Sequence, residues 1–293
     1  MTNSISKPTQ LNNLDKPFDI VQVFCQLDDT CKSLFPELFE KKIGRPLTLN
    51  LSLVCLFTLF QQNYCITTLK ALHKALTDYH SSDFKLPHYT KFVVAMNNYG
   101  KEILAILTMI CKLNLSTSGK IMFIDSTKLE VYKIWRARKH KTMKLLATKS
   151  KSTTGWYYGI KLHILVDQNG NILMFMFSTS TTDDRIFLRQ VLKIVKCSII
   201  VGDAGYLSQE LEKLAKENNN ILLTAKRSNM KTIEVMWQQE LMNMRSTVET
   251  VFSVMKTRMN LINTLPRSVN GYLNHYIRTL FKYMYQNCLV LDG

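Results

Sequence analysis

Three carboxylates, Asp125, Asp203 and Glu249, occupy positions where side chains could do chemistry. Asp125 follows the apolar run 121–124, and Asp203 follows a second run at 198–202. Short runs of this kind are typical of strands buried on both faces. Carboxylates without a Cys or His cluster suit a hard divalent cation such as Mg²⁺. Two such ions about 4 Å apart would support an in-line displacement at phosphorus.

The two apolar runs must lie side by side if their aspartates are to meet. We expect the second run to be parallel to the first, so that Asp125 and Asp203 leave the sheet at one edge. An aspartate after a strand is also a common turn or cap residue, and that alternative stays open.

Glu249 is expected on a long helix over residues 234–259. Apolar residues recur there at helical spacing and would face the sheet: Met244, Val248, Val251, Met255 and Met259. Glu249 lies about 100° round the helix from Val248, on the flank of this stripe. It could therefore point at the two strand ends, or it could simply pair with Arg245 or Lys256.

The order of predicted elements indicates a mixed α/β sheet with helices on both faces. We expect five strands and three helices after an all-helical first third spanning about 18–113. The strands are expected at 121–124, 155–166, 172–178, 198–202 and 221–225, and the helices at 185–195, 208–218 and 234–259. Residues 167–170, Asp-Gln-Asn-Gly, predict a hairpin turn.

Charge points to a polyanionic partner. The chain of 293 residues has 38 Lys and Arg against 22 Asp and Glu, a formal net charge of +16. This excess favours nucleic acid, with a generally basic surface as the alternative.

Much of the charge lies in an insertion at 128–151, which holds nine Lys and Arg and one acid. We expect contacts to DNA phosphates, sensitive to salt, from Lys133, Arg136, Arg138, Lys139 and Lys141. A solvated hairpin is the alternative. Trp135 could stack on a base or pack in the core.

Several polar residues outside the three carboxylates and the basic insertion also have predicted roles. We expect His163 on the surface or facing phosphate, and Asp183 and Asp184 to cap a helix, with an auxiliary acidic role as the second possibility. Arg267, together with Arg278 and Lys282 on a C-terminal helix, is expected to be available to DNA. The seven cysteines lack metal-binding spacing, and residues 1–15 are polar, so we expect a flexible tail, no membrane partner and a cytoplasmic protein.

The three carboxylates and the phrases around them resemble the DDE triad of insertion-sequence transposases. The phrases are Gly-Ile-Lys-Leu-His at 159–163, Gly-Asp-Ala-Gly-Tyr at 202–206, and Arg245, Glu249 and Lys256 at spacings of four and seven. With Leu-Pro-His-Tyr at 86–89, they are most similar to the IS982 group. The resemblance covers most of 45–285 and is strongest over 121–258. Met242 stands where the IS4-like signature has Tyr, which weakens the case for a tyrosine contact to DNA there.

This resemblance implies an RNase H-like fold and a DNA transposase. Its domains would be a tail (1–15), a helical DNA-binding module (16–115), a catalytic domain (116–262) and a C-terminal helix (263–293). Asp125, Asp203 and Glu249 would be the catalytic and metal-binding residues for Mg²⁺, with Mn²⁺ as a substitute. Arg245 and Lys256 would hold DNA phosphates.

The implied reaction cleaves the element ends and joins the freed 3′-OH to target DNA. Its partners would be the terminal inverted repeats and the target, bound by a dimer in the bacterial cytoplasm at the nucleoid. A nuclease of the same fold that joins no strands, or a DNA-binding remnant without catalysis, are the alternatives.

Overall fold

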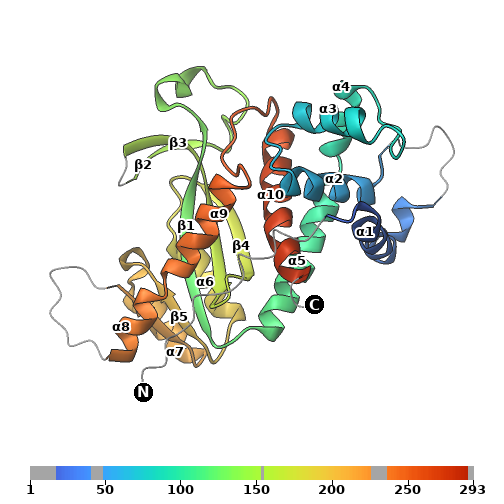
Figure 1. The fold of residues 1–293 in the computed structure, drawn as a ribbon. Coiled ribbons are helices and arrows are strands. Elements are labelled where there is room, and N and C mark those ends of the chain that lie inside the picture. The colour runs from blue at the N-terminus through green and yellow to red at the C-terminus, as the bar shows by residue number, and fades with distance from the viewer. Residues whose placement is uncertain (1–17, 41–48, 153–154, 226–235, 290–293) are drawn as a thin grey trace. The chain divides into compact units, whose positions relative to one another are not determined.

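The computed structural model describes residues 18–40, 49–152, 155–225 and 236–289 (Figure 1). The chain divides into a helical unit, Met1–Leu107 with Arg258–Asn260 and Asn270–Gly293, and a sheet unit, Thr108–Thr257 with Leu261–Val269. The expected flexible tail at 1–15 lies outside the described residues. None of the helices in the described ranges has the length and apolar character needed to cross a bilayer.

The sheet unit contains a six-stranded mixed sheet, which confirms the expected fold class. Its strands are β1 (Ile121–Tyr132), β2 (Thr148–Ser152), β3 (Gly155–Asp167), β4 (Ile172–Thr179), β5 (Ile199–Gly202) and β6 (Ile221–Thr224). The order is β2-β3-β1-β5-β6, with β4 also paired to β3. The β1–β3 and β3–β4 pairs are antiparallel, whereas β1–β5 and β5–β6 are parallel. The sixth strand, β2, comes from the basic insertion and pairs with the start of β3.

Strand β1 is much longer than its apolar run. The prediction that it ends at residue 124 is wrong, because the strand continues to Tyr132 and Asp125 lies inside it. Beyond Asp125 the side chains alternate, with Thr127, Leu129 and Val131 buried. This half of the strand stays ordered because it pairs with β3, for example Lys128 opposite Lys161.

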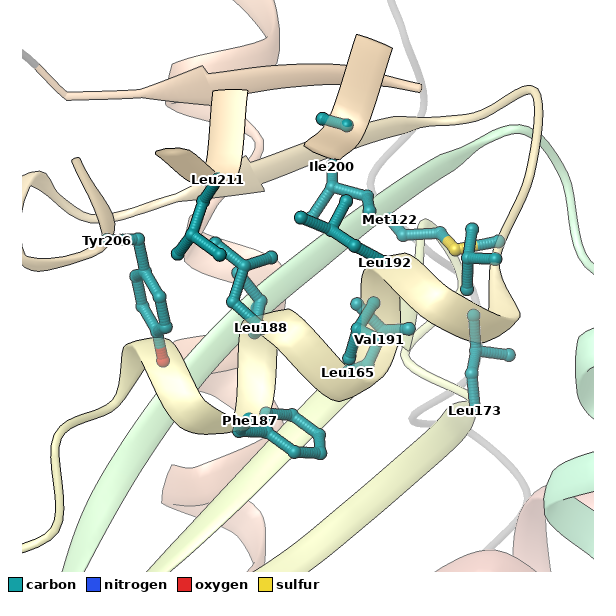
Figure 2. Packing of buried hydrophobic residues seen from close by; sticks show 13 residues of the cluster. Met122, Leu165, Leu173, Phe187, Leu188, Val191, Leu192, Ile200, Tyr206 and Leu211 are labelled. Atoms are coloured by element: carbon teal, nitrogen blue, oxygen red, sulfur yellow. The ribbon is translucent and has the colours of Figure 1, made fainter. Parts of the chain in front are cut away.

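One face of the sheet is covered by α6 (Arg185–Ile194) and α7 (Gln209–Glu217). Figure 2 shows how side chains from β1, β3, β4 and β5 meet those from the two helices in one apolar cluster. Its members include Met122, Leu165, Leu173, Leu188, Val191, Leu192, Ile200 and Leu211. The apolar residues of α6 recur at helical spacing and form a stripe that faces this cluster, among them Leu188, Val191 and Leu192.

The long helix expected at 234–259 is two helices, α8 (Met236–Asn243) and α9 (Ser246–Thr257). Met244 and Arg245 form a turn between them, in which Val248 N donates to Arg245 O rather than to the carbonyl four residues back. Asn243 and Ser246 flank this turn, and short polar side chains favour helix ends over helix interiors. The break places Arg245 at the start of α9, which packs against β1.

The helical unit confirms an all-helical front part of the chain. It contains α1 (Ile20–Leu34), η2 (Pro36–Leu38), α2 (Leu51–Asn63), α3 (Leu69–Tyr79) and α4 (Tyr89–Met96), with the first turns of α5 (Gly100–Thr117) and most of α10 (Val269–Leu289). Side chains cap three of these helices at their first turns, namely Asp19, Asn50 and Thr68.

The prediction that Arg278 and Lys282 are available to DNA is wrong, because both side chains are buried. Arg278 donates to the main-chain oxygen of Met96 and to Asn97 Oδ1, where a cation favourably meets the carbonyl end of α4. Lys282 donates to Gln61 on α2. The sequence predicts that α10 is a helix, but which of its side chains are buried depends on the helices packed against it.

Gly159 provides a test of the β1–β3 pairing. A Cβ at this position would collide with the main-chain oxygen of Leu129, and backbone cannot move away as a side-chain tip can. We expect Gly159→Ala to lower the free energy of unfolding by about 2 kcal/mol or more, measured by urea denaturation.

Gly119→Ala is the matched control, because nothing lies within 4 Å of a Cβ there. It should leave the free energy of unfolding unchanged or raise it slightly. Equal stability of the two variants would contradict the close approach of β3 to β1.

Candidate active site

The register of the sheet brings Asp125 and Asp203 together. Phe123 of β1 pairs with Val201 of the parallel strand β5, and each is two residues before its aspartate. The two carboxylates therefore project from neighbouring strands at matching positions, as the sequence predicts. Asp125 Oδ1 accepts from Ser126 N at 2.8 Å, and Asp203 Oδ1 accepts from Ala204 N.

Helix α9 contributes Glu249 to the same place, and Arg245 connects the acids. The Arg245 guanidinium lies 3.9 Å from Asp203 Oδ1 and 3.6 Å from Glu249 Oε1. Both distances are ion-pair contacts rather than hydrogen bonds. The pairing of Glu249 with Arg245, which was the simpler reading of the sequence, is thus present, and Asp203 shares it.

Asp125 responds electrostatically to the whole group. Its pKa is raised to about 6, first by burial and also by Asp203 and Glu249, while the Ser126 N–H and Arg245 act in the opposite direction. Burial and like charge both disfavour an ionised carboxylate. Three acids thus share one guanidinium, that of Arg245.

This charge balance bears on whether the acids could hold a metal ion. Within the described residues, no three His, Cys, Asp or Glu side chains lie close enough together to bind one. The donor chemistry nevertheless suits a hard cation, since carboxylate oxygens are its preferred ligands. Among the described residues, Arg245 Nε is buried without a hydrogen-bond partner, and the guanidinium contacts Asp203 and Glu249 only at ion-pair distance. A cation could replace the positive charge that Arg245 now supplies.

Lys256 extends the basic side of the site. Burial lowers its pKa, as does Lys128, while Asp125 and Glu130 act in the opposite direction. The side chain is half-buried on α9 and lies near the Phe252 ring, with its Nζ 5.9 Å from the ring centroid. Lys256 is thus within electrostatic reach of Asp125, and it lies two turns after Glu249 on the same face of α9.

Sequence reasoning gave only a minor role to Asp184, which joins a polar network behind Asp125. Its carboxylate pairs with Lys161 Nζ at 2.7 Å and accepts from Ser126 Oγ at 3.1 Å. It does not cap α6 with its side chain, although Asp183 accepts from Arg185 N. No local pattern could have indicated this pairing, because Asp184 precedes α6 and Lys161 lies on β3, 23 residues away in the sequence.

Two other residues of this network differ from expectation. The prediction of an exposed His163 is wrong: the ring is fully buried, bonds Ser178 Oγ at 2.7 Å, and has its pKa lowered by burial to about 4. Tyr206 received no role, yet its buried hydroxyl has no hydrogen-bond partner in the described structure. Burial raises the Tyr206 pKa, as do Asp184 and Asp125. Both rings lie on the side of the sheet that packs against α6.

The basic insertion forms a separate exposed element of the sheet unit. Its middle is the short helix η3 (Ile134–Lys139), and all five cations named from the sequence are exposed on it or beside it: Lys133, Arg136, Arg138, Lys139 and Lys141. Trp135 is 67% exposed and not part of the core. The Arg136 guanidinium lies over its ring at 4.3 Å from the centroid.

Comparison with known families identifies the sheet unit. Residues 115–269 match the family described as transposase DDE domain, which is more than half of the chain. The chain belongs to this DDE transposase family. The matched segment includes Asp125, Asp203 and Glu249, together with the basic insertion. No curated protein matches the chain.

Solved transposase structures also match this chain, with low sequence identity and low TM-scores. A piggyBac transposase synaptic complex with hairpin DNA matches with a TM-score of 0.48 and 13% identity, over 95% of this chain and 77% of that one. A Mos1 mariner paired end complex with Mn matches with a TM-score of 0.32 and 12% identity, over 95% and 89%. The assignment to the DDE family depends on the domain match alone.

The electrostatic effect of Arg245 on Asp125 predicts how the pKa of Asp125 changes when Arg245 is replaced. Because Arg245 lowers the pKa of Asp125, we expect Arg245→Ala to raise it above about 6, and Arg245→Lys to restore most of the difference. The measurement is a carboxyl ¹³C NMR titration of protein labelled at aspartate, with Asp125→Asn identifying the signal.

Arg189→Ala is the control, because Arg189 also pairs with a carboxylate, Glu210 at 3.0 Å, but does not act on Asp125. It should leave the Asp125 titration unchanged. An unchanged or lower pKa in Arg245→Ala would show that Arg245 does not face the acids in solution.

Proposed function

We propose that this chain is the transposase of an insertion element, which cleaves the element ends and joins the freed 3′-OH to target DNA. The observation that supports this most directly is the register of β1 and β5, which sets Asp125 beside Asp203 within the matched DDE domain. Glu249 is included in the proposed site because it contacts the same guanidinium, that of Arg245, as Asp203 does. Three acids from two strands and a helix are what phosphoryl transfer with divalent cations requires.

In this proposal Asp125, Asp203 and Glu249 hold Mg²⁺, for which Mn²⁺ substitutes. A bound pair of such ions would supply activation of the attacking oxygen and charge stabilisation of the leaving one. Arg245, released from its two carboxylates, would hold a DNA phosphate near the cut, and Lys256 would do the same from the next turns of α9. No nucleophilic side chain and no ATP enters the reaction.

The finer assignment is to the IS982 group of insertion sequences. It is supported by the phrases at 159–163 and 202–206 and by the spacing of Arg245, Glu249 and Lys256. Such an element acts at two inverted repeats, so we propose a dimer on DNA in the bacterial cytoplasm, at the nucleoid. The catalytic domain would span 116–262, with DNA-binding helices at 16–115 and a C-terminal helix at 263–293.

One assay separates this function from its alternatives. Pre-cleaved end DNA, a plasmid target and Mg²⁺ are incubated with the full chain, and the products are resolved on gels. We expect joined products. Cuts without joining would indicate a nuclease of the same fold, and bound but unchanged DNA would indicate a non-catalytic remnant.

The same assay tests the three acids. Asp125→Ala, Asp203→Ala and Glu249→Ala should each abolish Mg²⁺-dependent cleavage and joining while leaving DNA affinity largely intact, because they remove metal ligands and no phosphate contact. Glu210→Ala, which removes an exposed acid of α7, should keep full activity. Full activity in any one of the three variants excludes that residue from the site.

The basic insertion should account for a defined part of the salt dependence of DNA binding. Neutralising Arg136, Arg138 and Lys139 to Gln should lower the slope of log affinity against log salt by about 2.7, if each contacts one phosphate. The slope is measured by fluorescence anisotropy with a DNA duplex over a series of salt concentrations.

A second triple variant controls for the overall charge of the protein. Lys193, Lys213 and Lys216 are exposed lysines on α6 and α7, and their change to Gln removes the same charge. The slope should then change by much less. Equal losses in both variants would favour a generally basic surface over a specific contact element.

A further inference from the structure

The basic insertion exposes its largest side chain. Trp135 is 67% exposed, although it belongs to the regular turns of η3. The smaller apolar residues Ala137, Met143 and Ala147 of the same insertion are buried. Tryptophan is among the side chains that are most buried on average in folded proteins. The fold thus buries the small apolar residues of the insertion and leaves the indole ring outside.

Local contacts hold the indole ring in a defined place. Within η3, Arg136 N donates to Lys133 O at 2.9 Å. After η3, the His140 ring lies 5.0 Å from the Tyr132 ring at the end of β1, measured between ring centroids. Trp135 is therefore carried by an anchored element, and a partner that binds the ring pays little for ordering it.

One face of the indole ring is already occupied. The Arg136 guanidinium lies over it, 4.3 Å from the ring centroid, which is a favourable cation–π distance. Within the described ranges no other aromatic or cationic group contacts the ring. The opposite face of Trp135 is thus open to a second planar group, and the guanidinium steadies the ring from behind.

Cations without acidic partners surround this open face. The one acid of the insertion, Glu130, pairs with Lys128 at 3.0 Å. The exposed cations that follow it form no ion pair in the described structure, namely Lys133, Arg136, Arg138, Lys139, Lys141 and Lys144. A flat ring among unpaired cations fits a ligand that carries flat rings on a negatively charged chain. A nucleic acid strand with accessible bases has this chemistry.

The ring is remote from the three acids. β1 continues from Asp125 to Tyr132, about 23 Å at the rise of a strand, before the insertion begins. Figure 1 shows the insertion beyond the end of β1 that is farther from β5. DNA that contacts Trp135 is therefore DNA that flanks the reacting phosphate. The bases of an intact duplex are stacked on each other, so a ring can stack only on a base that has left the stack.

We propose that Trp135 is a binding site for a nucleobase that is unpaired or turned out of the duplex. The base stacks on the open face of the indole ring, opposite Arg136. This inference rests on the proposed binding of DNA by the insertion, and it adds a preference for distorted DNA that phosphate contacts cannot supply. It also assigns the contact to flanking DNA and not to the site of the cut.

The test measures the affinity of the full chain for three DNA probes by fluorescence anisotropy, in EDTA so that no strand is cut. The probes are a paired duplex, the same duplex with one extra unpaired thymidine, and the same duplex with an extra abasic residue at that place. We expect the thymidine probe to bind about tenfold more tightly than the abasic probe. The abasic residue keeps the charge and flexibility of the backbone and removes only the base.

Three variants assign this preference to the indole ring. Trp135→Leu should abolish the preference and leave the salt slope unchanged, because it removes no charge. Trp135→Phe should keep most of the preference, since it retains an aromatic face. Trp156→Leu is the matched control, because Trp156 is 62% exposed on β3 and carries no cation over its ring in the described structure. It should keep the full preference.

Each contrary result overturns the stacking site in its own way. Equal affinity of the unmodified chain for the thymidine and abasic probes shows that no base is bound. A preference that survives in Trp135→Leu, or is lost equally in Trp156→Leu, assigns it elsewhere. A changed salt slope in Trp135→Leu shows that the ring only positions Arg136. Strand joining and the slope of the triple Gln variant report separately on the proposed function, since neither depends on an unpaired base.

Discussion

Pairing of β1 on both of its edges is the constraint on which the sheet unit depends. On one edge β1 is antiparallel to β3, and on the other it is parallel to β5. Its even positions, Met122 and Ile124, enter the cluster under α6, so Asp125 projects to the opposite face. A shift of one residue would exchange these faces and bury the carboxylate in the apolar cluster. The same register that packs the core thus sets Asp125 beside Asp203.

The three acids are close to a single guanidinium, that of Arg245. Arg245 contacts two carboxylates at ion-pair distance, and Asp125 keeps a pKa near 6 in spite of it. On the other side, Asp184 is fully engaged by Lys161 and Ser126. Hydrogen-bonded polar groups therefore lie behind three acids that share the single guanidinium of Arg245. Such an arrangement is typical of sites that function with a bound cation.

The chain uses its basic residues in two different ways. The cations around η3 are exposed beside Trp135, where they can follow a polyanion at its surface. In the helical unit, Arg278 and Lys282 are buried and face carbonyl or amide oxygens. Net charge counts the exposed and the buried cations alike. The buried cations nevertheless carry a free-energy cost of desolvation that the exposed ones do not.

The sequence by itself determined the features that local patterns encode. Apolar runs specified the strands, the stripe of α6 specified its buried face, and two similar phrases indicated that Asp125 and Asp203 lie on neighbouring strands. What depends on partners distant in the chain was decided only by the tertiary structure. β1 extends past Asp125 because β3 pairs with it, and His163 is buried because β4 and α6 cover it. The break before α9 and the burial of Lys282 likewise depend on packing, since propensity and periodicity do not record which neighbour a side chain will meet.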